Sequence, residues 1–152
     1  MKDKLNQKLE LCGHELNLKE NFSGDKFIDN EYTGNFIINE KEIKVLITVD
    51  ERLVDYKITC EKFLNNFEEN YKNVLMTIAK ELCFEINQWH QNRDHEITQE
   101  EIVKRLSKSN LEIDCAFGEF WVVILDDDGL AFGEQFIYQE NLDTHEVIIE
   151  LG

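Results

Sequence analysis

Residues 63–89 read FLNNFEENYKNVLMTIAKELCFEINQW, and their apolar side chains recur at steps of three and four positions. This spacing predicts a helix that buries one stripe along its length. The pair Asn65-Asn66 interrupts the pattern, because asparagine is unfavourable inside a helix and favourable as its cap. We therefore expect a short helix from about Tyr56, a break at the asparagines and a long helix that ends near Trp89.

The long helix should be the scaffold of the domain. From residue 67 to residue 89 it would be about 35 Å long, at roughly 1.5 Å per residue, so other elements can pack along it. Its apolar stripe predicts that Leu75, Ile78 and Leu82 are fully buried. Lys72 and Lys80 lie off that stripe and should tolerate replacement by alanine.

A second, short helix has a clear start signal. Thr98 is placed as the N-cap with Glu101 at the third helical position, and Ile97 and Ile102 can form a hydrophobic staple. Together with the long helix, this gives a helical region over residues 56–107.

Strands are expected before the helical region. Residues 32–49 alternate apolar and polar side chains around a polar turn at residues 39–42, which predicts a hairpin. Residues 1–20 fit two structures: a hairpin that turns at Gly13-His14, or a helix that ends at Gly13. We favour the hairpin.

Strands also follow the helical region. Residues 120–125 are almost wholly apolar, which is typical of a central strand that is at least partly covered on both faces. Asp128-Gly129 predicts a hairpin turn before the chain returns. The expected strands cover residues 111–115, 120–125, 131–138 and 147–151.

This order of strands, helices and strands predicts an α+β fold. We expect a single domain over residues 1–152, with two layers: a mostly antiparallel sheet of five to seven strands, packed against one long helix and one or two short helices. The C-terminal antiparallel strands occupy residues 111–151.

The cysteines and the absence of membrane signals indicate a cytoplasmic protein. The four cysteines are too far apart for a paired metal motif, and their apolar surroundings favour free, buried thiols in a reducing compartment. The N-terminus has no apolar run typical of a signal peptide, and no stretch approaches the roughly 18 apolar residues of a membrane span.

The charge distribution is uneven. The formal net charge is −16, and of the thirty-two acids twenty-one lie up to Asn110, where sixteen Lys and Arg nearly balance them. The remaining eleven acids lie in residues 111–152, which contain no Lys or Arg. Such a field repels nucleic acid and anionic membranes and attracts a basic protein partner.

Strand alternation is expected to send the acids of the C-terminal strands to solvent. We predict that they contribute to one continuous negative surface that binds the partner; the alternative is that they only keep the sheet soluble. The candidate partner-binding residues are Glu112, Asp114, Asp126, Asp127, Asp128, Glu146 and Glu150.

No group of residues has the spacing of a catalytic or metal site. His90 and His95 are five residues apart across a helix end, which matches no ligand motif. The acidic run before Gly129 fails the calcium-loop pattern because Ile124 occupies its first ligand position. Cys12-Gly13-His14 joins a thiol and an imidazole only through sequence adjacency. We expect no catalytic residue, metal or cofactor.

Several structural motifs resemble a family of small bacterial domains of unknown function, over about residues 20–152. The resemblance implies no assigned activity, although relatives of this general type are suspected among immunity proteins encoded beside bacterial toxins. In that family the glycine equivalent to Gly133 is often followed by histidine, whereas this chain has Glu134. The motifs are residues 86–89 (INQW), 97–101 (ITQEE), Asp128-Gly129, Phe132-Gly133, Ile137 and 147–152 (VIIELG).

These observations favour a non-enzymatic acidic binding protein, of the immunity or inhibitor type, that neutralises a basic partner such as a toxin domain. The alternative is an uncharacterised domain with a small-molecule or metal site between sheet and helices. The sequence does not indicate the oligomeric state.

Overall fold

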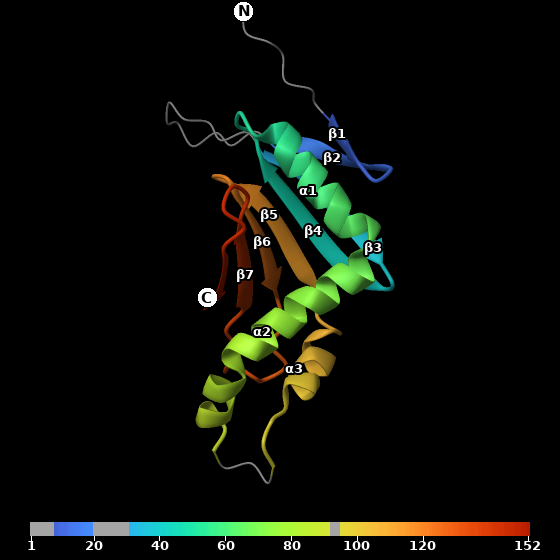
Figure 1. The fold of residues 1–152 in the computed structure, drawn as a ribbon. Coiled ribbons are helices and arrows are strands. Elements are labelled where there is room, and N and C mark those ends of the chain that lie inside the picture. The colour runs from blue at the N-terminus through green and yellow to red at the C-terminus, as the bar shows by residue number, and fades with distance from the viewer. Residues whose placement is uncertain (1–7, 20–30, 92–94) are drawn as a thin grey trace, which may run out of the picture.

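A computed structural model of the protein describes residues 8–19, 31–91 and 95–152. In these ranges one eight-stranded sheet carries three helices on a single face (Figure 1). The strands follow one another across the sheet in chain order. The elements are β1 (Lys8–Leu11), β2 (His14–Lys19), β3 (Glu31–Ile38), β4 (Lys41–Thr48), α1 (Leu53–Asn65), α2 (Phe67–Trp89), α3 (Gln99–Leu106), β5 (Leu111–Ala116), β6 (Glu119–Ile124), β7 (Phe136–Asn141) and β8 (Val147–Leu151).

The α+β class is confirmed, but the sheet is larger than the five to seven strands expected. The N-terminal hairpin joins the same sheet, because β2 pairs with β3 through Asn17 and Thr33. All neighbouring strands are antiparallel except β4 and β5, which are parallel and place Val45 beside Ile113. The three helices form the crossover that this parallel pair requires.

The core lies between the helices and one face of the sheet. Side chains on neighbouring strands share a row when their residues are paired, so Val45, Ile113 and Val122 point to the same face, and all three are fully buried. On the helical side, Leu75 and Ile78 of α2 are buried against them, as predicted.

Leu82, in contrast, is only partly buried, so the prediction for this residue was wrong. The C-terminal part of α2 extends past the ends of the strands (Figure 1), where it packs on α3 and loops. The next position of the stripe, Ile86, is fully buried again, so Leu82 is a local gap in the buried face of α2. Near the same end, Phe84 and Trp89 remain exposed.

The break at the asparagines and the start of α3 are confirmed, whereas α1 begins at Leu53, three residues before the expected Tyr56. The backbone breaks at Asn66, which has φ −129° and ψ 52°, and α2 begins at the next residue. At α3, the Glu101 backbone N–H donates to Thr98 Oγ1 over 3.1 Å, the expected N-cap contact.

The two N-terminal hairpin turns differ from those expected, the first by a shift of one residue and the second by being two residues shorter. The β1–β2 hairpin is present, but it turns at Cys12-Gly13, so that Leu9 and not Leu11 pairs with Leu16. Both turn residues have positive φ, 48° and 80°, as the tight two-residue hairpin turn requires. The β3–β4 turn likewise uses only Asn39-Glu40.

The return strand after β6 begins later than expected. Residues 128–133 form successive turns with positive φ at Asp128, Gly129, Phe132 and Gly133, so β7 starts at Phe136 instead of residue 131. Phe132, which lies within the strand expected over residues 131–138, is consequently 70% exposed.

Candidate functional site

The face of the sheet opposite the helices is covered by no helix in the described part of the chain (Figure 1). Strand residues that alternate with the core positions point to this side. The open sheet face is defined by the two rows of these residues that cross all five strands from β4 to β8. Its residues are Lys44, Leu46, Glu112, Asp114, Trp121, Val123, Ile137, Gln139, Ile148 and Glu150.

Strand pairing arranges these side chains in two rows across the sheet. One row runs Lys44, Glu112, Val123, Ile137 and Glu150. Neighbouring strands are about 4.8 Å apart, so the two glutamates stand roughly 14 Å from each other with two apolar residues between them.

The second row runs Leu46, Asp114, Trp121, Gln139 and Ile148. Asp114 thus has an aliphatic residue on one side and the indole on the other. Ile148, at the far end of the row, is 48% exposed. The open sheet face therefore mixes acids with apolar side chains in neighbouring positions.

The Asp114 carboxyl is the most perturbed acid of this face. Burial, followed by the charges of Glu112 and Glu31, raises its pKa from 3.8 to about 6. Asp114, Glu112 and Glu31 form no ion pair with a described residue, since no basic nitrogen lies within 4.0 Å of their carboxylate oxygens. The site holds clustered negative charge that the described chain does not neutralise.

Trp121 adds an unused hydrogen-bond donor. Its indole N–H is shielded from solvent and has no acceptor among the described residues. Sequence reasoning assigned Trp121 to the core because residues 120–125 are almost all apolar. Strand alternation could have predicted its position. Phe120, Val122 and Ile124 point to the helices, so Trp121 between them points to the opposite face.

The seven predicted acids do not form one continuous surface. Glu112, Asp114 and Glu150 share the open sheet face. Glu146 precedes β8 next to Asn141, at the end of the sheet where β6 begins. Asp126, Asp127 and Asp128 follow the other end of β6, about 20 Å away at 3.3 Å per residue.

The Asp126–Asp128 turn has a structural role within the β6–β7 connection. Arg105 Nε on α3 donates to Asp128 Oδ2 over 2.8 Å, and the Asp128 backbone N–H donates to Asp126 Oδ1 over 2.9 Å. The charge of Asp128 is thereby partly offset by a base of the same chain.

Asp127 is buried, so the expectation that it faces solvent was wrong. Its carboxylate accepts backbone N–H groups from Gly133, Ala131 and Gly129 over 2.8, 2.9 and 3.2 Å. Burial alone would raise its pKa, but these hydrogen bonds outweigh that effect and lower it. Asp127 holds the loop together and is not available to a partner.

The two histidines considered as metal ligands have separate protein partners. His90 Nε2 lies 3.0 Å from the carbonyl oxygen of Leu130, and its ring stacks on Phe132. His95 Nε2 lies 3.3 Å from Glu101 Oε1. Residues 92–94 between them are outside the described ranges, within which no metal-ligating cluster of three or more such residues occurs.

Cys12 and His14 are not arranged as a nucleophile and its base. Cys12 Sγ lies 3.2 Å from Asn65 Oδ1, and burial raises the pKa of the thiol, opposite to the shift of an activated cysteine. The His14 ring instead packs edge-on against Phe36, with centroids 4.7 Å apart. All four cysteines are free, and Cys60 and Cys115 are buried.

The comparisons with known proteins identify the family. Residues 20–147 match DUF2262, described as an uncharacterized protein conserved in bacteria, and the chain belongs to this family. The predicted resemblance to a bacterial family of unknown function is thus confirmed. Neither the curated proteins nor the solved structures gave a match. In the described ranges, no helix has both the length and the apolar character needed to cross a membrane.

Proposed function

We propose that this member of DUF2262 is a non-enzymatic binding protein whose open sheet face takes a basic partner protein. An immunity or inhibitor protein that neutralises a toxin domain would work in this way. The main supporting observation is Asp114, a partly buried carboxyl beside Glu112 and Glu31 that forms no ion pair with a described residue.

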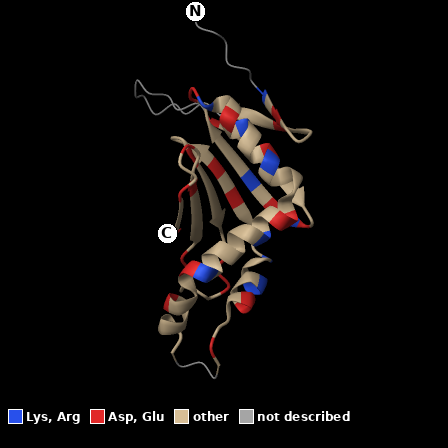
Figure 2. Cartoon of the chain, viewed as in Figure 1, with Lys and Arg blue, Asp and Glu red and all other residues tan. Residues whose placement is uncertain are grey.

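Charge complementarity supports a basic protein as the partner. Figure 2 shows acidic but no basic residues on the four strands that follow α3, in agreement with the sequence from residue 111 onward. Lys44 is the one base on the open sheet face as defined above. A Lys or Arg of a partner would relieve the repulsion among the acids, and it would steer the encounter.

The apolar residues argue that this face does more than keep the sheet soluble. A sheet face that only meets water usually alternates with polar side chains. Here Trp121, Val123, Ile137 and Ile148 lie beside the acids. A protein partner with basic and apolar side chains would cover both kinds of position, whereas nucleic acid would be repelled.

The test compares two sets of acid-to-amide substitutions. The site variant carries Glu112→Gln, Asp114→Asn and Glu150→Gln. The control carries Asp55→Asn, Glu81→Gln and Glu85→Gln on the exposed sides of α1 and α2, and has the same net charge. The probe is a short peptide that alternates lysine and leucine, titrated calorimetrically at low and high salt.

We expect the site variant to bind about tenfold more weakly at low salt, since each exposed ion pair contributes roughly 0.2–1 kcal/mol. The salt dependence of its affinity should also be smaller, and the control should remain close to the parent. Equal affinities of the two variants would reject the open sheet face as the binding surface. Sequencing of the adjacent genes would show whether a basic toxin domain is encoded there, and such a domain would be the first natural partner to titrate.

A further inference from the structure

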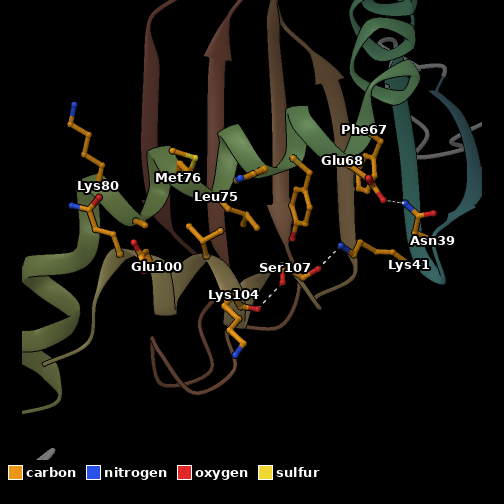
Figure 3. Close-up of a pocket in the computed structure, with 15 residues that line it drawn as sticks. Asn39, Lys41, Phe67, Glu68, Leu75, Met76, Lys80, Glu100, Lys104 and Ser107 are labelled. Carbon is orange, nitrogen blue, oxygen red and sulfur yellow. Dashed lines mark hydrogen bonds between the residues drawn. The ribbon is translucent and has the colours of Figure 1, made fainter. Parts of the chain in front are cut away.

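A groove of about 790 Å³ lies between α2 and α3, on the helical side of the protein and away from the open sheet face (Figure 3). It follows α2 from Glu68 to Lys80, about 18 Å at 1.5 Å per residue. The β3–β4 turn closes one end, where Lys41 and Ser107 meet.

The floor of the groove is apolar. Phe67, Tyr71, Leu75 and Ala79 recur every four residues and form one stripe of α2, and Val103 of α3 completes the floor. The only polar atom of this floor stripe, the Tyr71 hydroxyl, already donates to the carbonyl oxygen of Leu106 over 3.0 Å. The floor therefore suits a hydrocarbon chain.

Lys41 places a positive charge at the closed end. Its ammonium lies 4.5 Å from the centroid of the Tyr71 ring and 5.6 Å from that of Phe67, and it donates to the carbonyl oxygen of Ser107. It forms no ion pair within the described residues. Burial lowers the pKa of Lys41, while the nearby Glu68 opposes this effect.

The rim is basic although the protein as a whole is acidic. Lys72 and Lys80 of α2 and Lys104 of α3 line the groove, against Glu68 and Glu100. In Figure 3, Lys80 and Lys104 extend away on opposite sides and leave the mouth between them open. With Lys41, four cations face two acids, in a chain whose formal net charge is −16.

We propose that this groove binds a free long-chain carboxylate, with the hydrocarbon on the α2 stripe and the head group at Lys41. The ammonium would gain an ion-pair partner, which the described residues do not provide within 4.0 Å, and such a charge-assisted bond is stronger than a neutral one. The volume and the apolar floor are those of a small-molecule site. The site is independent of the open sheet face.

Titration calorimetry with dodecanoate, below the concentration at which it forms micelles, tests this site. Dodecanol is the neutral analogue, and vesicles rich in anionic phospholipid test the membrane as an alternative source of the head group. Lys41→Met removes the ammonium and keeps the chain length. Lys72→Glu with Lys104→Glu reverses two exposed rim charges and should fold normally. Lys57→Glu with Lys62→Glu, both on α1, is the matched control away from the groove and from the open sheet face.

We expect dodecanoate to bind at least tenfold more tightly than dodecanol, a difference of about 1.4 kcal/mol. Lys41→Met and the rim variant should each lose about tenfold or more, and the control should change little. Equal binding of acid and alcohol, an equal loss in the control, or no binding of dodecanoate would each overturn the proposal. Binding to the vesicles without binding to dodecanoate would also overturn the proposal, because it would indicate that the groove contacts a membrane.

Discussion

Asp114 and Asp127 show at the residue scale how contacts decide the behaviour of a carboxylate. Asp127 accepts three backbone N–H groups, which lower its pKa despite burial. Asp114 is partly buried beside other acids, and its pKa rises to about 6. The first carboxylate is therefore part of the fold, whereas ionisation of the second opposes folding and leaves charge for a partner to neutralise.

Replacing Asp114 by asparagine should stabilise the protein at neutral pH. The folded-state pKa lies above the ordinary 3.8, so the folded protein holds the proton more tightly and loses stability as pH rises towards and through about 6. After allowance for solvent screening of a partly exposed group, the gain should be about 1 kcal/mol at pH near 7 and near zero at pH about 4. Urea unfolding of parent and variant across this range measures it.

Asp143→Asn is the opposite control. Arg52 donates a hydrogen bond to the Asp143 carboxylate and lowers its pKa. The stabilisation from this contact is therefore present at neutral pH and is lost as pH falls. This substitution should destabilise at neutral pH and have little effect in acid. If Asp114→Asn shows that same pattern, the environment assigned to Asp114 is wrong.

At the element scale, α2 was the most predictable part of the chain, because its stripe is periodic and Asn66 marks its start. Thr98 and the β1–β2 hairpin were also readable from local signals. The point at which α2 extends past the sheet could not be predicted from the sequence, because it depends on the lengths of strands elsewhere in the chain.

The candidate surfaces were less predictable than the elements. Exposure of Glu112 and Asp114 followed from alternation, but the separation of Asp126 and Glu146 to opposite ends of β6 follows from strand register. The groove was missed because it is built from α2, α3 and the β3–β4 turn together. From the sequence alone, Lys72 was predicted to lie outside the apolar stripe of α2, and nothing indicated that it borders a groove.

Alanine substitutions along α2 should reproduce its uneven burial. Ile78→Ala removes a fully buried side chain and should cost about 2–5 kcal/mol in the free energy of unfolding. Leu82→Ala should cost clearly less, because Leu82 is partly buried at the end that passes the sheet. Lys72→Ala, on the surface, should stay within about 0.5 kcal/mol. Denaturant unfolding of the three variants decides this, and an unchanged midpoint for Ile78→Ala would contradict the packing of α2.

At the scale of the whole molecule, the two candidate surfaces lie on opposite sides of the sheet and differ in charge. The open sheet face carries Glu112, Asp114 and Glu150, and the groove on the helical side carries Lys41, Lys72, Lys80 and Lys104 (Figures 2 and 3). A basic partner and an anionic amphiphile would therefore occupy different surfaces. The sheet keeps the two sites apart, so each can be altered without removing the other.

The most direct test of the central claim is to locate where a basic partner binds. We propose following the backbone amide signals of isotopically labelled protein by NMR while the lysine–leucine peptide is added at low salt. The largest shifts should fall on β5, β6 and β8, they should decrease as salt is raised, and a glutamate–leucine peptide should produce none there. Shifts that concentrate on the acids of α1 and α2, or that spread evenly over the surface, would contradict the assignment of the open sheet face as the binding site.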